Sequence, residues 1–254
     1  MTVRHHIDME RKYKSTMNVL ILSGGSMDET WAEEWIKDKH FDFCIAADRG
    51  LEKADRLGVK VDLLLGDYDS VDRGLLEKYR SDTRTITYPC EKDYTDTHIA
   101  VKKAIEYIQK NVSEIAENKG FVRDSGMFED ADYTRGSISI IGATGTRYDH
   151  AITNIFVMQE ALTAGVECAI YDKFNKIYLK NAAFDIERDK QYGKYLSFAP
   201  MSEEVTLSLT GVKYPLDRYV LRQGMSICQS NEITDKTAHV DIISGKLVVF
   251  ETSD

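Results

Sequence analysis

Residues 63–70 read LLLGDYDS, an apolar run that ends in a glycine and leads into two carboxylates two positions apart. The run over 61–65 has the composition of a strand that is buried on both faces of a sheet. Alternate side chains of an extended chain point the same way, so Asp67 and Asp69 can both reach one cation. The residues at the ends of the other strands decide whether this stretch is a site or a simple turn.

The composition is that of a soluble globular protein. Of the 254 residues, 43% are hydrophobic and 30% are charged, and the net charge is −9. This acidic balance argues against nucleic acid as a partner. No apolar run approaches the roughly 20 residues that span a bilayer, and residues 1–16 form a polar leader without the apolar region of a secretory signal. We therefore expect a cytoplasmic protein that does not bind a membrane.

The four cysteines are far apart, which favours buried thiols over a metal or redox site.

Strand and helix patterns alternate over residues 17–178 and predict an α/β domain with a mainly parallel, doubly wound sheet. Two segments, 95–109 and 148–164, have helical periodicity. The polar segment 111–135 breaks the alternation, and we interpret it as an insertion that leaves the sheet. In 148–164 the expected apolar face consists of Ile152, Ile155, Phe156 and Leu162. The expected strands are 18–22, 43–47, 61–65, 84–88, 137–141 and 167–171.

The pattern changes beyond residue 178. Short strand patterns replace the helical ones, and Val205, Leu207 and Leu209 alternate with polar residues, so one face of this strand is expected to be buried. Ser244 and Gly245 lie between two apolar runs and predict a hairpin turn. We interpret residues 179–254 as a second, smaller domain with an antiparallel β-sandwich fold.

Acidic residues or glycines follow five consecutive strands of the first domain. Because ligands of parallel α/β sheets bind at the carboxyl ends of the strands, we expect these residues to meet on one rim. Converging carboxylates repel one another unless a cation lies between them, and Mg²⁺ commonly shares such sites with substrate phosphates. In strand order the residues are Gly24 and Gly25, then Asp48, then Asp67 and Asp69, then Asp93, Thr95 and Asp96, then Gly142, Gly145, Arg147 and Asp149.

The segment after the fifth strand has the complementary chemistry. Gly142 and Gly145 allow backbone N–H groups to approach an anion at a helix N-terminus, and Arg147 can make paired hydrogen bonds to phosphate. Asp149 either begins the next helix or orients Arg147. The chain contains neither a P-loop nor a dinucleotide fingerprint. The residues alone therefore predict a magnesium-dependent enzyme that handles a nucleotide or a polyphosphate.

Six segments, taken in order, resemble the signature blocks of the thiamine pyrophosphokinase family. The resemblance runs from about residue 18 to the end of the chain. It implies transfer of the β,γ-pyrophosphoryl group of ATP to the hydroxyethyl oxygen of thiamine, which gives thiamine diphosphate and AMP. It also implies a homodimer in which thiamine lies at the subunit interface. The segments are AADRG (46–50), LLLGDYDS (63–70), EKDYTDTHIA (91–100), IGATGTRYDHAITN (141–154), TGVKYPL (210–216) and CQSNEIT (228–234).

The resemblance implies an acidic metal site on the rim. Asp67 and Asp69 would hold Mg²⁺, with Asp96 as the third acidic partner and Asp48 on the same rim. Attack of the thiamine hydroxyl on the β-phosphorus would displace AMP, and Asp96 or Asp69 would accept the hydroxyl proton. Reactions of this type depend mostly on positioning and on neutralisation of charge.

The resemblance also implies contacts to both substrates. Lys92, Thr95 and Arg147 would face the phosphates of ATP, although Thr95 could equally cap the helix that follows it. Ser230 and Asn231 would contact the aminopyrimidine ring of thiamine, where a turn at the end of a strand is the structural alternative. Two positions depart from the pattern of many relatives, which have glycine where this chain has Arg49 and Thr146.

Two other functions fit part of the pattern. The segment DYDSV (67–71) matches the nucleophile loop of haloacid-dehalogenase-like phosphatases, with Asp67 as the residue that would be phosphorylated. Against this alternative, the segment follows the third expected strand instead of the first, and the later acidic pair of those phosphatases does not occur. A nucleotide-binding module without turnover is the second alternative, but it would gain little from several carboxylates that repel one another.

Overall fold

The computed structural model describes residues 17–69, 71–89, 93–118 and 136–254. The polar leader, Lys92 and the part of the expected insertion that follows residue 118 lie outside the described residues. No helix within the described ranges is long and apolar enough to cross a membrane. The described cysteines are buried free thiols, as their spacing predicted, and they are Cys44, Cys168 and Cys228.

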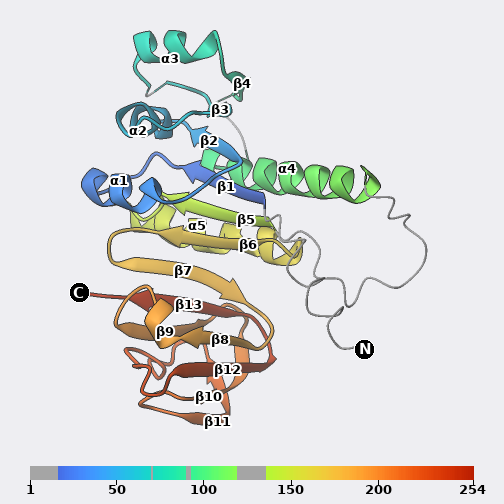
Figure 1. The fold of residues 1–254 in the computed structure, drawn as a ribbon. Helices are drawn as coiled ribbons and strands as arrows, with labels where there is room; N and C mark the ends of the chain where they lie inside the picture. Colours follow the sequence, from blue (N-terminus) through green and yellow to red (C-terminus); the bar gives the residue numbers. More distant parts are fainter. Residues whose placement is uncertain (1–16, 70, 90–92, 119–135) are drawn as a thin grey trace, which may run out of the picture.

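Nine strands of the described chain form one sheet, which runs through both parts of the molecule in Figure 1. The expected strands are confirmed with their ends within one or two residues. Neighbours in the first part of the sheet pair in parallel, and this part consists of β4 (Arg84–Thr87), β3 (Leu63–Gly66), β2 (Phe43–Ala47), β1 (Met17–Leu22), β5 (Gly136–Ile141) and β6 (Glu167–Tyr171). The sheet continues with antiparallel neighbours, which are β7 (Asn175–Lys180), β13 (Leu247–Thr252) and β9 (Tyr195–Pro200).

Helices cover both faces of the parallel part. Along β1, Val19 and Ile21 face one helix layer, and Leu20 and Leu22 face the other. Because water is excluded from both faces, these strands are apolar along their whole length. The doubly wound α/β fold is therefore confirmed (Figure 1). One layer consists of α4 (Asp96–Asn118) and α5 (Tyr148–Thr163), and the other of α1 (Glu29–Lys37), α2 (Gly50–Arg56) and α3 (Arg73–Arg80).

The second part of the chain forms a β-sandwich that shares strands with the large sheet. A sheet of four described strands packs through apolar side chains such as Leu207 and Val240 against Phe198 and Val249 of the large sheet. The expected division after residue 178 falls inside β7, which pairs with β6 on one side and β13 on the other. The four strands are β11 (Leu216–Arg222), β10 (Glu204–Thr210), β12 (Thr237–Ser244) and β8 (Phe184–Glu187), and the 3-10 helix η1 (Arg188–Lys190) follows β8.

The expected hairpin at Ser244 and Gly245 is wrong. β12 pairs with β10 and β8, whereas β13 pairs with β7 and β9, so the turn carries the chain from one sheet to the other. The apolar side chains explain this path. β12 is buried at alternate residues, but β13 is buried over Leu247–Val249 in succession, which suits a strand inside the large sheet.

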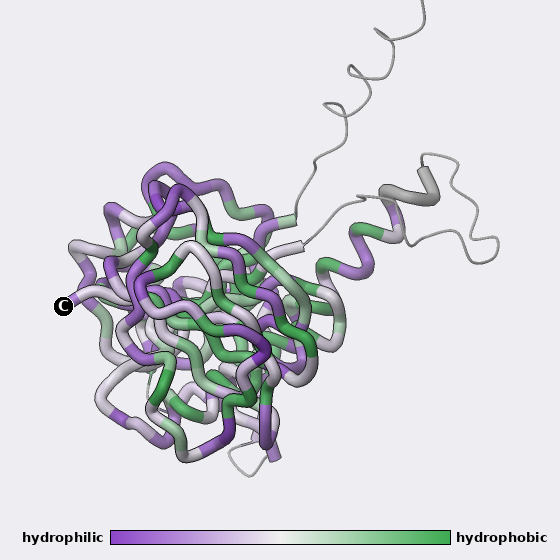
Figure 2. Tube along the Cα trace, turned by 90° about the horizontal axis from the view of Figure 1, so that it is seen from below, coloured by the Kyte–Doolittle hydropathy of each residue, from purple (hydrophilic) through white to green (hydrophobic). Residues whose placement is uncertain are grey.

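Two helices differ in detail from their sequence patterns. The polar segment that starts at residue 111 begins as helix, because α4 continues to Asn118 and projects beyond the body of the molecule (Figure 2). Val112 still packs on the core, while Lys110 and Glu114 form an ion pair of 3.7 Å one turn apart. In α5 the apolar face is narrower than expected, as Ile152 and Phe156 are 52% and 54% exposed.

Candidate active site

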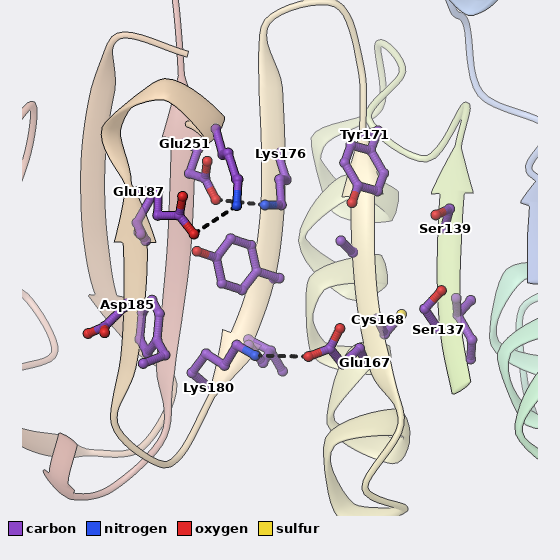
Figure 3. Close-up of a pocket in the computed structure, with 17 residues that line it drawn as sticks. Ser137, Ser139, Glu167, Cys168, Tyr171, Lys176, Lys180, Asp185, Glu187 and Glu251 are labelled. Carbon is purple, nitrogen blue, oxygen red and sulfur yellow. Dashed lines mark hydrogen bonds and ion pairs between the residues drawn. The ribbon is translucent and has the colours of Figure 1, made fainter. Parts of the chain in front are cut away.

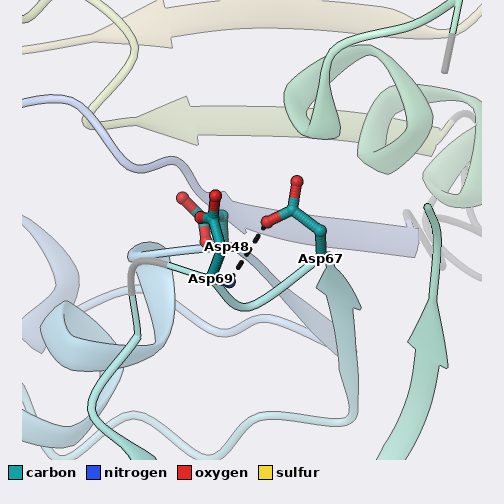
Figure 4. A group of neighbouring side chains, drawn as sticks. All are labelled: Asp48, Asp67 and Asp69. Carbon is teal, nitrogen blue, oxygen red and sulfur yellow. Dashed lines mark hydrogen bonds between the residues drawn. The ribbon is translucent and has the colours of Figure 1, made fainter. Parts of the chain in front are cut away.

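The carboxylates that follow β2 and β3 meet at one end of the parallel sheet. In the described part of the chain, Asp48, Asp67 and Asp69 each bring one carboxylate oxygen within 4.8 Å of the others. Figure 4 shows the side chains pointing to the same side of the strand ends. The parallel register, in which Ala47 lies opposite Leu65, ends the two strands at the same level. The expected rim is therefore present, with Asp48 as a full member of the acidic cluster.

Local backbone geometry holds this cluster together. Gly66 has a φ of 151°, and a Cβ at this position would lie 3.2 Å from the Cα of Asp48. Glycine thus lets the ends of the two strands approach. The next residue but one, Tyr68, also has positive φ; its ring is buried and its hydroxyl donates a hydrogen bond to the carbonyl of Ile86 at 3.0 Å. The anchored ring fixes the backbone between the two carboxylates, which lie on the side of Asp48.

Asp48 carries the electrostatic strain of the cluster. Its Oδ1 is buried and has no hydrogen-bond partner within the described ranges. Burial raises the pKa of Asp48; the N–H of Arg49 opposes this shift, and the charges of Asp96, Asp67 and Asp69 raise the pKa further. A buried acceptor without a donor, surrounded by like charges, matches what a hard divalent cation requires of its ligands. Asp48, Asp67 and Asp69 could therefore hold Mg²⁺.

A cleft of about 610 Å³ adjoins the acidic cluster through Asp48. It lies where the strand order reverses, because β1 is followed by α1 on one face and its neighbour β5 by α5 on the other face. Crevices of this kind bind ligands in open α/β sheets. Most of the residues expected on the rim line this cleft, namely Gly24, Gly25, Asp48, Thr95, Asp96, Gly142, Gly145 and Arg147.

The glycines of the cleft pack the loops after β1 and β5 backbone to backbone. The N–H of Gly25 donates a hydrogen bond to the carbonyl of Gly142 at 2.9 Å. A Cβ on Gly25 would lie 2.6 Å from that carbonyl oxygen, and one on Gly145 would lie 2.9 Å from the nitrogen of Ser26. The buried Asn154 holds the β5 loop from α5 by donating to the carbonyl of Ala143 at 2.9 Å. The glycines are therefore needed for close approach.

The exposed side chain of Arg147 forms a two-pronged ion pair with Asp149. Their closest contact, Nη2 to Oδ2, is 2.6 Å, and Nε lies 3.2 Å from Oδ1. The hydrogen bonds from Arg147 lower the pKa of Asp149 to about 2. Asp149 also lies in the first turn of α5, so both interpretations of this residue apply. The pair orients the guanidinium of Arg147, which lines the cleft.

Thr95, Arg49 and Thr146 each have a different local role. The hydroxyl of Thr95 accepts a hydrogen bond from the N–H of His98 at 3.2 Å, which caps the start of α4. Arg49 lines the cleft and pairs with Glu52 at 3.6 Å. Thr146 is absent from the described residues with positive φ, so the lack of glycine there does not strain the backbone.

Sequence reasoning missed Lys53. This lysine of α2 is only 6% exposed, and its Nζ donates hydrogen bonds to the carbonyls of Ser23 and Gly25. Nothing in the helical pattern distinguishes it from the exposed lysines of neighbouring helices. The signal lies in the packing of α2 against the loop after β1, which the sequence does not display.

The residues expected to contact thiamine lie far from the acidic cluster. Asn231 forms a bridge to Leu196 of β9. β3 and β9 are second and ninth in the sheet order, so seven strand spacings of about 4.8 Å put them roughly 34 Å apart. Within one chain, therefore, these residues and the cluster do not form a common site.

The amide of Asn231 is already engaged in the fold. Its Oδ1 accepts hydrogen bonds from the N–H groups of Tyr214 and Glu232, and its Nδ2 donates to the carbonyl of Tyr214, all at 3.0 Å. The ring of Tyr214 is exposed. Ser230, by contrast, is exposed, has a φ of 52° and donates its N–H to the hydroxyl of Ser197. Asn231 thus fixes the backbone of Tyr214 beside an exposed serine.

A second cleft, of about 440 Å³, lies over β5, β6 and β7 beside β8 (Figure 3). Its charged side chains neutralise one another. Lys176 contacts Glu251 at 2.8 Å, and Lys180 contacts Glu167 at 3.5 Å. Since no charge of one sign accumulates, this cleft lacks the electrostatic features found beside Asp48.

The chain matches two family models, "Thiamin pyrophosphokinase, catalytic domain" over residues 36–170 and "Thiamin pyrophosphokinase, vitamin B1 binding domain" over residues 182–247. The protein belongs to the thiamin pyrophosphokinase family. The first model spans the acidic cluster and the part of the cleft that follows residue 36, and the second spans most of the β-sandwich. The resemblance of the six sequence segments is therefore confirmed.

Individual relatives agree with this assignment. The chain is 28% identical over 215 residues to the thiamine pyrophosphokinase of Bacillus subtilis, which covers 83% of this chain and 87% of the relative. A crystal structure of thiamine pyrophosphokinase from Bacillus subtilis superposes with a TM-score of 0.74 at 26% identity, covering 93% of this chain and 99% of that chain. Thiamin pyrophosphokinase from Candida albicans, at 18% identity and a TM-score of 0.71 over 93% of this chain and 89% of that chain, shares the fold.

Replacing Asp48 with Asn should stabilise the protein when divalent cations are removed. The change deletes one of the mutually repelling charges, and asparagine tolerates the positive φ of 48° at this position. We expect the melting temperature in EDTA to rise by roughly 2–4 °C, which corresponds to about 1 kcal/mol in a protein of this size. Asp241→Asn, at an exposed position of β12, serves as the control and should not change it. An unchanged or lower melting temperature for Asp48→Asn would contradict the electrostatic description.

Proposed function

We propose that this member of the family transfers the pyrophosphoryl group of ATP to the hydroxyl of thiamine with the help of Mg²⁺. The observation that carries the proposal is the acidic cluster of Asp48, Asp67 and Asp69 beside a cleft made of two glycine loops and Arg147. A cluster of this kind binds a cation, and the cleft binds an anion. The complex of ATP with Mg²⁺ brings a cation and an anion to the site as one ligand. As the reaction consumes ATP, we propose the cytoplasm as its compartment.

Each part of the site has a separate task in this proposal. The N–H groups of the glycine loops and the guanidinium of Arg147 bind the phosphate oxygens and orient the chain of phosphates. Asp48, Asp67 and Asp69 would hold Mg²⁺, which supplies neutralisation of phosphate charge when it is bound. Asp96 lines the same cleft, and its charge raises the pKa of Asp48 as those of Asp67 and Asp69 do, so it would act beside this group of three.

The hydroxyl of thiamine attacks the β-phosphorus in line with the bond that breaks. A new bond forms between the hydroxyl oxygen and the β-phosphorus, and the bond from the β-phosphorus to the bridging oxygen of AMP breaks. AMP leaves with that oxygen, and the hydroxyl proton passes to a carboxylate. We assign this proton to Asp96 because it faces the cleft, whereas Asp69 belongs to the cluster.

The products of the reaction test this proposal. With Mg²⁺, ATP and thiamine, the wild type should form thiamine diphosphate and AMP in equal amounts, measured by phosphorus NMR or chromatography. Asp67→Asn should lower turnover at least about 100-fold, because one ligand of the cation is lost, with little change in melting temperature. Asp241→Asn should match the wild type.

Three outcomes would overturn the proposal. Formation of ADP would indicate an ordinary kinase, and ATP binding without release of AMP would indicate a binding module. A phosphate or beryllofluoride adduct trapped on Asp67 would indicate a phosphatase of the haloacid-dehalogenase type.

We further propose that two copies of the chain complete the thiamine site. The separation of roughly 34 Å within one chain requires a second copy to bring its β-sandwich to the cleft. A stripe on α5 provides a surface for this contact, since Tyr148, Ile152 and Phe156 recur every fourth residue and are 82%, 52% and 54% exposed. His150 and Asn154 of the same helix line the cleft, so the stripe lies next to the place where thiamine must arrive.

A charged substitution in this stripe should both separate the subunits and stop the reaction. Ile152→Asp should shift the protein from dimer to monomer in sedimentation velocity, with loss of thiamine diphosphate formation and no loss of helix content. Ile243→Asp, at a partly exposed apolar position of β12, is the matched control and should remain dimeric and active. A wild type that sediments as a monomer at the concentrations of the assay would refute the proposal.

A further inference from the structure

Lys53 is a buried cation beneath the two glycine loops, and the chemistry proposed above does not use it. Its Nζ donates hydrogen bonds to the carbonyls of Ser23 and Gly25 in the loop after β1. A Cβ added to Gly142, in the loop after β5, would lie 2.9 Å from the same Nζ. One ammonium group therefore contacts both loops that form the cleft.

The hydrogen bonds of Lys53 determine where the loop points its own donors. In a trans peptide the C=O and N–H of one unit point in opposite directions. When the carbonyls of Ser23 and Gly25 turn toward Lys53, the N–H groups of Gly24 and Ser26 turn away from it. Both residues line the cleft, and neither N–H has a hydrogen-bond partner in the described part of the chain. The loop thus offers two unpaired donors to an anion.

Burial makes the charged form of the Lys53 ammonium group less favourable than it is in water. Burial lowers the pKa of Lys53 to about 8, the positive charges of Arg49 and Arg56 lower it further, and Glu52 and Glu29 act in the opposite direction. The two acceptors that the loop after β1 offers to Nζ are backbone carbonyls, which carry no full charge. Near pH 8 the lysine therefore exchanges between a form with three N–H donors and a neutral amine.

The charged groups across the cleft complete this environment. Asp96 of α4, and Arg147 and His150 at the start of α5, line the same cleft as Lys53. Among the three residues of the acidic cluster, Asp48 lines the cleft, and its Oδ2 lies 3.8 Å from where a Cβ on Gly24 would be.

We propose that Lys53 is a positioning residue for ATP, because its ammonium group turns two peptide units of the loop after β1 so that their N–H groups face the phosphates. The inference rests on the proposed function, since it requires ATP in this cleft. A neutral amine holds the carbonyls more weakly, so affinity for ATP falls when Lys53 loses its proton.

Binding of Mg·ATP, measured by calorimetry without thiamine, tests this inference. Between pH 7.5 and pH 9.0 the wild type should lose about fivefold to tenfold in affinity, as the charged fraction of a group with a pKa of about 8 falls. Lys53→Met should bind at least about tenfold more weakly at pH 7.5 and show no pH dependence. Lys53→Arg keeps its charge and should lose the pH dependence while retaining affinity. Lys60→Met, an exposed control, should match the wild type.

Kinetic constants separate this role from a purely structural one. Lys53→Met should raise KM for ATP and leave KM for thiamine unchanged. Wild-type affinity that is constant from pH 7.5 to pH 9.0, or a folded Lys53→Met that binds like the wild type, would overturn the inference while leaving the proposed function intact. A wild type that does not bind Mg·ATP at any pH would overturn both. If the variants do not fold, the pH dependence of the wild type decides the matter.

Discussion

Repulsion between carboxylates at the ends of two adjacent strands is the constraint around which this site is organised. The parallel register of β2 and β3 ends both strands at one level and brings Asp48 against Asp67 and Asp69. One buried oxygen of Asp48 has no donor among the described residues, and this strengthens the repulsion because water does not reach that oxygen. The repulsion therefore lowers the stability of the fold, and a bound cation would reduce it. The rigid sheet keeps the three carboxylates close together in spite of the repulsion.

The cleft beside this cluster follows from the topology of the sheet. The chain leaves β1 and β5 toward opposite helix layers, so a crevice must open between the loops after these strands. Glycines let the two loops touch through their backbones, and Lys53 turns the peptide units of one of them. Negative charge is thus held at β2 and β3, while donors for an anion are held at β1 and β5. A ligand that carries both a cation and phosphates matches this division.

Local patterns predicted the parallel strands and most of the rim, because buried parallel strands have an unmistakable composition and their carboxyl ends meet wherever the sheet is parallel. These local patterns could not predict the contacts between segments that are far apart in the sequence. The turn at Gly245 resembles a hairpin locally, but the burial of β13 on both faces places it in the other sheet. Likewise, Ile152 and Phe156 have the periodicity of a core face although they are exposed, and Lys53 looks like any surface lysine until α2 is packed.

The position of a bound cation decides whether the acidic cluster is the metal site. Crystals grown with Mn²⁺ and a non-hydrolysable ATP analogue would locate the ion by its anomalous scattering. We expect a peak at about 2.0–2.3 Å from carboxylate oxygens of Asp48, Asp67 and Asp69, with the phosphates extending toward the glycine loops. An ion held only by the phosphates, or one bound away from these carboxylates while the analogue occupies the cleft, would contradict this expectation.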